Sequence, residues 1–179
     1  MEYQAVLSFW FEELTPAQWW KKDEQFDAVI AERFSHYYRS ASLGELAHWR
    51  DSPAGRLAEI IVLDQFSRNM FRDTAQAFAT DGQALVLAQE AIRAGADTVL
   101  SEVQRSFLYM PFMHSESLAI QDRSIELFTA LGLEGNLKFA HAHRDIIVQF
   151  GRYPHRNQML WRDSTEEEMA FLEGPNSSF

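Results

Sequence analysis

The apolar residues of the chain recur at intervals of three and four positions, a spacing that predicts amphipathic helices along almost its whole length. Strand signals are nearly absent, because apolar and polar residues do not alternate over any sustained stretch and no Asn-Gly or Asp-Gly pair joins two such stretches. We therefore expect an all-α protein with at least seven helices. The periodic segments are residues 2–13, 16–21, 24–41, 53–71, 80–94, 101–112, 115–131, 136–150 and 165–173.

Residues that favour helix ends mark many of these boundaries. The segments 15–18 (Thr-Pro-Ala-Gln) and 101–104 (Ser-Glu-Val-Gln) are typical capping boxes, and Ser-Pro at 52–53 and Ser-Thr-Glu-Glu at 164–167 indicate two further helix starts. Helix ends are indicated by glycines that follow amphipathic stretches, namely Gly95, Gly132 and Gly151. The connections are short, so consecutive helices are expected to be antiparallel and to form helical hairpins.

We expect these hairpins to form a single domain over residues 1–173, followed by a loose C-terminal tail at 174–179. A succession of helical hairpins packs either as a bundle or as a tetratricopeptide-like stack, in which each hairpin buries its apolar face on the next. The chain shows no clean repeat of about 34 residues. The prediction of a tetratricopeptide-like stack is therefore based only on the succession of hairpins.

The composition narrows the classes of protein. The 16 Lys and Arg against 26 Asp and Glu give a net charge of −10, which disfavours binding to nucleic acid. No apolar run is long enough to cross a membrane and the N-terminus lacks the basic region of a signal peptide, so a soluble cytoplasmic protein is expected. The chain has no cysteine, which excludes disulfides and Cys-ligated zinc, and we expect neither a metal nor a cofactor.

Two charged residues interrupt the apolar stripe of the segment 53–71. Asp64 and Arg68 lie four positions apart in the middle of this stripe, so they are expected to be buried and to pair with each other, with Asn69 beside them. One interpretation is an ion pair that only stabilises the core, because buried charges are almost never left unpaired. The other interpretation is that the pair contributes to a polar site. The sequence leaves both open.

A histidine interrupts the apolar stripe of the segment 136–150 in the same way. His143 lies at the centre of this stripe, which begins at Phe139 and ends at Phe150. His141 points to the other side of the helix, which argues against a metal site made by the two histidines. His143 is therefore either a hydrogen-bonded core residue or a member of a functional site.

A second histidine, His114, shares an apolar face with residues of the segment 101–112. Pro111 is expected to bend or end that helix, which would place His114 and Glu116 at the start of the next one. Glu116 then has a structural interpretation, as a carboxylate favoured in the first turn of a helix. Its functional interpretation is that it orients an imidazole.

Basic residues cluster in the loop that follows residue 151. Arg152, His155, Arg156 and Asn157 fall within six positions of an otherwise acidic chain, and Pro154 favours an extended turn there instead of a helix. Arginine is the preferred partner of carboxylate and phosphate groups, so this loop is suited to an anionic ligand. The structural alternative is that the arginines cap helix carbonyls and pair with acids of the core.

We expect the polar interruptions of three helices and this basic loop to converge on one internal site that binds a small anion. Removing a charged side chain from water costs roughly several kcal/mol in desolvation free energy. A ligand site is one reason why a protein would keep charged residues in its interior. The expected ligand-binding residues are Asp64, Arg68, Asn69, His114, Glu116, His143, Arg152, His155, Arg156 and Asn157.

Three strings of residues closely resemble a known bacterial family. They are 63–71 (Leu-Asp-Gln-Phe-Ser-Arg-Asn-Met-Phe), 113–116 (Met-His-Ser-Glu) and 150–157 (Phe-Gly-Arg-Tyr-Pro-His-Arg-Asn). The family is domain of unknown function 924, and the resemblance covers nearly the whole chain, although Ser67 and Tyr153 stand where the family usually has proline and phenylalanine. It implies a tetratricopeptide-like all-helical fold. It transfers no catalytic residue, because the family has no established activity.

Two classes of function remain. The first is a small-molecule site, in a sensor or in an enzyme of hydrolase type without a metal, where the arginines hold an anionic group and a histidine transfers a proton. The second is a module that binds a peptide or a partner helix in an aromatic groove, with no catalysis. The oligomeric state, including a homo-oligomer, stays open. The aromatic residues of the second hypothesis are Trp10, Trp19, Trp20, Tyr37 and Tyr38.

Overall fold

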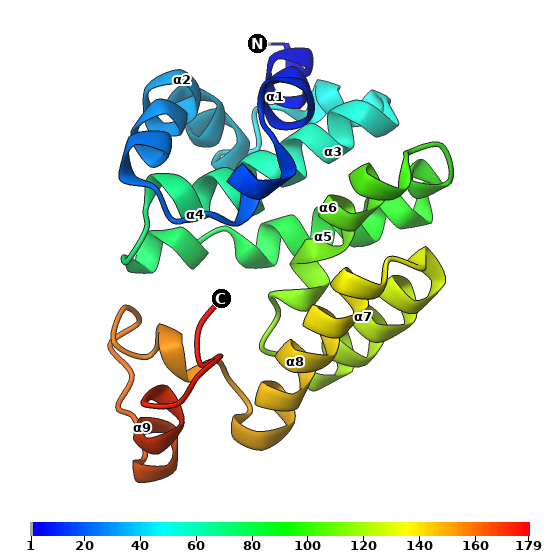
Figure 1. Cartoon of the computed structure of the whole chain (residues 1–179). Coiled ribbons are helices and arrows are strands. Elements are labelled where there is room, and N and C mark those ends of the chain that lie inside the picture. The colour runs from blue at the N-terminus through cyan, green and yellow to red at the C-terminus, as the bar shows by residue number, and fades with distance from the viewer. Residues whose placement is uncertain (1) are drawn as a thin grey trace. The chain divides into compact units, whose positions relative to one another are not determined.

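The computed structural model describes residues 2–179, and these residues form nine α-helices and no strand, which confirms the predicted all-α class (Figure 1). The helices are α1 (Tyr3–Ser8), α2 (Glu24–Ser42), α3 (Pro53–Ile61), α4 (Ser67–Met70), α5 (Asp81–Arg93), α6 (Glu102–Met113), α7 (Leu118–Leu131), α8 (Glu134–Phe150) and α9 (Glu166–Leu172). Each lies within or close to a segment predicted from the apolar spacing. Whether they form a tetratricopeptide-like stack stays a prediction.

Shorter helical turns fill several of the connections. Two are π-helical, at Phe9–Glu13 and Val62–Phe66. The 3-10 turns are Pro16–Trp20, Ala47–Asp51, Ala75–Phe78, Ala96–Thr98 and Pro154–Arg156. Among the 3-10 turns, only Pro16–Trp20 was predicted from the sequence. The other 3-10 turns have three to five residues, which is too few for a period of 3.6 residues to be visible in the sequence.

The chain divides into two compact units. The first contains the described residues up to Arg72 together with Gln76–Pro111, and the second contains Asp73–Ala75 and Phe112–Phe179. The expectation of one domain over residues 1–173 therefore stays a prediction. The tail at 174–179, expected to be loose, makes contacts within the second unit that are described below.

Capping residues fix the helix boundaries in the places that the sequence indicates. The Ser52 hydroxyl accepts a hydrogen bond from the Gly55 amide at 3.0 Å, and the 15–18 and 101–104 segments form the predicted boxes. At α9 the box joins Thr165 and Glu168, so it begins one residue later than the start of the predicted 164–167 segment. The glycines that close α5, α7 and α8 have φ values of +72°, +80° and +70°, a region that side chains disfavour.

The segment predicted as one helix at 53–71 is the buried centre of the first unit. It consists of α3, the π-helical turn Val62–Phe66 and α4, and its residues from Leu57 to Phe66 are buried on every side. Glu59 is among them. The burial of Asp64 in the apolar stripe was therefore predicted correctly, although the spacing does not predict the extra residue that the π-helical turn inserts.

Aromatic rings pack around this central segment. The Phe66 ring lies 5.9 Å from Phe9, 5.6 Å from Trp10 and 4.8 Å from Phe34, measured between ring centroids. Trp10, Tyr37 and Tyr38 of the expected aromatic groove are themselves buried. These contacts favour a core role for most of the groove residues, in agreement with the aromatic richness of the chain.

Helix α6 continues past Pro111 and ends at Met113, one residue beyond the predicted segment 101–112, so the proline does not end the helix at its own position. The continuation is short, and the carbonyls that lose helical partners find another donor. The Gln121 side-chain amide on α7 donates to the carbonyls of Met113 and Ser115, each at 2.7 Å. This buried amide therefore provides a donor for carbonyls at the C-terminal end of α6, where the helix has no further backbone donors.

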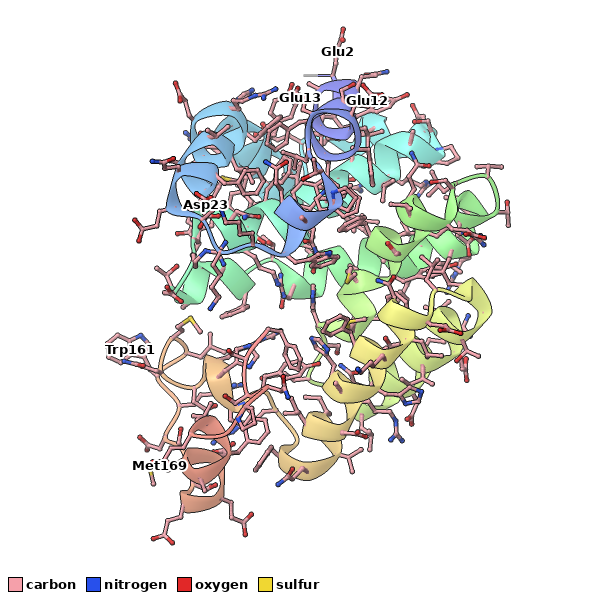
Figure 2. All side chains as sticks on the ribbon, viewed as in Figure 1. Glu2, Glu12, Glu13, Asp23, Trp161 and Met169 are labelled. Atoms are coloured by element: carbon pink, nitrogen blue, oxygen red, sulfur yellow. The ribbon has the colours of Figure 1, made fainter. Side chains whose placement is uncertain are left out.

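Trp161 closes a turn in a backbone conformation that usually requires glycine. Its φ is +56°, the Arg162 amide donates to the Asn157 carbonyl at 2.9 Å, and the Trp161 amide donates to Gln158 at 3.4 Å. This is the pattern of a Schellman motif, with Trp161 in the left-handed position. Its side chain is 93% exposed and projects into solvent in Figure 2.

We expect Trp161→Gly to stabilise the protein by about 0.5–1 kcal/mol, because glycine relieves the left-handed strain and the exposed ring contributes little packing. Trp161→Ala removes the ring but keeps the strain, so its free energy of unfolding should stay close to that of the wild type. Urea denaturation measures both values. A Trp161→Gly protein less stable than Trp161→Ala would contradict this account.

Candidate functional site

The site lies in the second unit, where α7 and α8 form a helical hairpin. Gly132 ends α7 in the left-handed conformation, and α8 begins two residues later, so the two helices run side by side (Figure 1). Gly151 ends α8 in the same way. The chain then enters the basic loop, which contains one 3-10 turn at Pro154–Arg156 where an extended turn was predicted. The correction is small, since proline at the first position of a helical turn loses no hydrogen bond.

Tyr153 anchors this loop in the core of the unit. Its side chain is fully buried, and its hydroxyl donates to the Met113 carbonyl at 2.6 Å while it accepts from the Gln121 amide at 2.7 Å. Its backbone amide donates to Glu116 at 2.8 Å. These hydrogen bonds hold the loop against the end of α6 and the start of α7. The positions of the following residues, His155 and Arg156, are thereby fixed.

Arg156 is a buried cation. The Cζ atom of its guanidinium lies over the Tyr153 ring at 4.7 Å from the centroid, and its Nη2 donates to the His114 carbonyl at 2.9 Å. A cation–π contact and a backbone carbonyl orient the group, and its charge also helps to lower the pKa of the Glu116 carboxylate. Arg156 is therefore one member of a network of polar contacts inside the unit.

Three imidazoles lie close to one another or to the Tyr153 ring. The centroid of the His143 ring is 6.3 Å from that of His114 and 5.7 Å from that of Tyr153, and the His155 ring is also 5.7 Å from Tyr153. His143 Nδ1 is 2.7 Å from the Phe139 carbonyl. A carbonyl only accepts, so Nδ1 carries the proton and Nε2 of the neutral ring is left as an acceptor.

The surroundings of His143 favour its neutral form. Burial is the main cause that lowers the pKa of His143 to about 3, and a positive charge on His114 lowers it further. The hydrogen bond to the Phe139 carbonyl opposes this shift, and His155 and Arg156 make smaller lowering contributions. A positive charge on His143 is therefore disfavoured by its burial and by its basic neighbours.

Other residues of the predicted site have structural partners. Arg152 makes a bidentate pair with Glu168 at 2.7 and 2.8 Å, and its hydrogen bonds lower the pKa of Glu168 to about 2. The buried Asn157 amide donates to Ser164 and to Glu168. These contacts favour a structural role for Arg152 and Asn157, because their polar groups hold α9 against the loop.

Glu116 was expected in the first turn of α7, but it precedes that helix by two residues. It also has a structural partner, because its carboxylate accepts hydrogen bonds from both terminal nitrogens of Arg162, at 2.8 and 2.9 Å. Burial alone would raise the pKa of Glu116, but hydrogen bonds from Arg162 and Tyr153, with the charge of Arg156, hold that pKa below its ordinary value. Glu116 is therefore a carboxylate that fixes the loop.

Arg162 was missed by the sequence analysis. It also donates to the Asn157 side chain at 2.9 Å and to the Tyr153 carbonyl at 3.0 Å, so one guanidinium joins two residues of the loop to Glu116. Only the left-handed turn at Trp161 directs it inward. A tryptophan in that position gives no turn signal, and this is why the sequence did not reveal Arg162.

The remaining predicted site residues belong to the first unit. Asp64 is buried as expected and lies 3.4 Å from Arg68, but Arg68 makes its closer, bidentate pair with Asp81 at 2.8 and 3.0 Å. Asn69 donates to Asp27 of α2 at 2.8 Å. The expected pair therefore exists, Arg68 also joins α4 to α5, and Asn69 joins α4 to α2.

The stripe predicted on α8 needs one correction. Phe139 is 58% exposed, whereas Ala140, His143, Ile146 and Ile147 are buried. The buried seam therefore begins one residue later, since Ala140, His143 and Ile147 follow the spacing of three and four along one face. His143 occupies the middle of this seam, as predicted, and His141 is exposed.

The described part of the chain shows neither a metal-binding cluster nor a membrane-spanning helix. Among residues 2–179 no group of three or more His, Asp and Glu side chains is arranged to hold a metal ion. No helix in the same range has the length and apolar character needed to cross a membrane.

Comparisons with known proteins place the chain in a family. A family profile described as bacterial protein of unknown function (DUF924) matches residues 6–176. A comparison with curated proteins finds no significant match. Among solved structures, a protein of unknown function from Agrobacterium tumefaciens is 42% identical, with a TM-score of 0.91 over 96% of this chain and 97% of that one. The profile match spans nearly the whole sequence, and the chain therefore belongs to the DUF924 family of bacterial proteins.

Proposed function

We propose that the second unit binds a small anion, a carboxylate or a phosphate, at the cluster formed by His114, His143, His155 and Arg156. The observation that carries this proposal is the buried Arg156 guanidinium, which lies in one cluster with the imidazoles of His114, His143 and His155. An anion bound in this cluster would be attracted by the guanidinium and would supply acceptors for N–H donors.

The chemistry of the cluster suits an anion with two or more oxygens. A guanidinium offers several N–H donors in a fixed plane, which matches carboxylate and phosphate oxygens. The imidazoles add donors when protonated, and a bound anion would itself raise their pKa values. We therefore expect binding to take up protons and to strengthen as the pH falls from 8 towards 6.

The test compares two arginines of the same loop. Arg156→Gln removes the proposed anion-binding cation, whereas Arg152→Gln removes an arginine that pairs with Glu168. Isothermal titration with phosphate, sulfate and acetate at pH 6.5, at constant ionic strength set with chloride, should show binding to the wild type. Arg156→Gln should weaken that binding by about tenfold or more, as expected for the loss of a charge-assisted pair worth about 1.5–3 kcal/mol.

Both substitutions remove a hydrogen-bonded arginine and are expected to lower the melting temperature. The response to anions separates them, because a ligand raises the melting temperature only where it binds the folded state. The Arg152→Gln protein should keep the anion-induced rise, and the Arg156→Gln protein should lose it. The proposal is wrong if no anion stabilises the wild type or if the two variants respond alike.

A further inference from the structure

Trp10 has an indole N–H group that is buried without a hydrogen-bond acceptor. The residue belongs to the π-helical turn Phe9–Glu13 of the first unit, and its side chain is fully buried. Among the described residues no acceptor lies within hydrogen-bond distance of its Nε1. A buried tryptophan usually donates its N–H to a partner, because the indole has lost its hydrogen bond to water. This group therefore needs an acceptor that the described chain does not supply.

The surroundings of this donor are apolar. The ring centroids of Phe107, Phe66 and Trp19 lie 5.5, 5.6 and 6.3 Å from that of Trp10. The Trp10 carbonyl already accepts a hydrogen bond from Trp19 Nε1 at 2.9 Å. A buried water usually makes about three hydrogen bonds, so a single donor among aromatic rings is a poor place for one. An acceptor atom carried by an apolar molecule suits these surroundings better.

A series of rings in contact leads from Trp10 to the surface of the first unit. Trp19 is half-buried and lies 5.0 Å from Phe107, measured between centroids. Trp20 is 59% exposed and stacks on Phe107 at 5.9 Å, with 10° between the ring planes. The cluster of Trp10, Phe107, Trp19 and Trp20 therefore has a buried end with an unpaired donor and an exposed end with a flat ring.

Trp19 and Trp20 belong to the 3-10 turn Pro16–Trp20, and no residue of this turn is buried. The capping box of Thr15 and Gln18 fixes the shape of the turn from within. The hydrogen bond from Trp19 to the Trp10 carbonyl and the ring contacts join the turn to the rest of the unit. Segments with few buried contacts open at a low free energy. The turn can therefore move away and uncover Phe107 and Trp10.

We propose that Trp10 Nε1 is the anchor of a second binding site, for a small uncharged aromatic molecule with an acceptor oxygen, such as an aryl ketone, and that the turn Pro16–Trp20 admits it. The oxygen accepts the hydrogen bond from Trp10, and the ring of the ligand packs against the aromatic rings of the cluster. These rings carry no charge, so a carboxylate or an ammonium group among them would be buried without a partner. The site lies in the first unit, and it does not depend on the anion site proposed above.

The experiment follows the indole N–H signals of protein labelled with ¹⁵N at its tryptophans, during titration with three uncharged probes. Acetophenone has an aromatic ring and an acceptor oxygen, ethylbenzene lacks the acceptor, and cyclohexyl methyl ketone lacks the aromatic ring. Acetophenone should move the Trp10 proton downfield and leave that of Trp49, a buried residue packed on Tyr37, unchanged. Ethylbenzene should bind about tenfold more weakly, because the donor stays unpaired, and the aliphatic ketone about threefold more weakly.

Trp10→Phe assigns the Trp10 signal and removes the donor while it keeps an aromatic ring. This variant should bind acetophenone and ethylbenzene with affinities within about twofold of each other. Trp161→Phe is the matched control, since it makes the same change at an exposed residue of the second unit, and it should keep the preference of the wild type.

The site is disproved if the wild type binds acetophenone no better than ethylbenzene, if Trp10→Phe keeps the preference, or if none of the probes binds. A Trp10 proton that lies upfield and does not respond to acetophenone would show that the faces of neighbouring rings satisfy the N–H group, which also disproves the site. If Trp10→Phe does not fold, the remaining indole signals, the preference of the wild type and the Trp161→Phe control decide the question.

Discussion

The free energy of unfolding is expected to fall by about 4 kcal/mol between pH 6.5 and pH 3.5 through the titration of His143 alone. Burial and the charges of His114, His155 and Arg156 lower the pKa of His143 to about 3 in the folded protein, whereas a histidine of the unfolded chain titrates near 6.5. Between these two values the unfolded chain binds a proton that the folded protein does not bind. Stability therefore decreases as the pH falls, by about 1.4 kcal/mol per pH unit.

His143→Gln removes this titration and keeps a donor for the Phe139 carbonyl. Urea denaturation at several pH values should show that the variant is the less stable protein at pH 7, where it has lost the ring contacts, and that the difference shrinks or reverses at pH 3.5. His141→Gln is the control, because His141 is exposed on the same helix. Its curve should run parallel to that of the wild type. Parallel curves for His143→Gln and the wild type would show that the imidazole is not held neutral.

The helices could be predicted from the sequence because the interactions that define them lie within a few residues of each other. The spacing of apolar residues and the caps at 15–18, 52–53 and 101–104 act within a few residues of each other, and the structure places helix starts where they indicate. His143 could be found for the same reason, since a polar residue in the middle of an apolar stripe is visible on one helix.

The partners of these residues could not be predicted, because they come from distant parts of the chain. Arg162 reaches Glu116 across 46 positions, and Phe179 reaches His143 from a tail that appeared to be loose. The π-helical turn at Val62–Phe66 adds a residue that no spacing rule indicates. The sequence therefore predicts which polar groups are buried, while only the structure shows which of them stabilise the loop and which remain to bind a ligand.

Glu59 is a second case of a buried charge whose partner lies outside its helix. Its carboxylate is fully buried on α3 and accepts two hydrogen bonds from Arg50, both at 2.7 Å, which raise the pKa of Arg50. Arg50→Ala leaves this carboxylate buried without its cation. We expect a loss of about 3–5 kcal/mol in the free energy of unfolding, measured in urea at pH 7, since desolvation of the charge is no longer offset.

Two controls distinguish the loss of stability caused by a buried charge without its partner from the loss caused by breaking an ion pair. Arg144→Ala breaks the pair with Asp122, whose side chain is 54% exposed, and water can solvate the carboxylate that remains. Its cost should stay below about 1 kcal/mol. The double variant Arg50→Met, Glu59→Leu removes both charges and should recover most of the stability lost in Arg50→Ala, because apolar side chains of similar volume need no compensation. Equal losses for Arg50→Ala and Arg144→Ala, or a double variant no more stable than Arg50→Ala, would mean that burial of the Glu59 carboxylate does not set the cost.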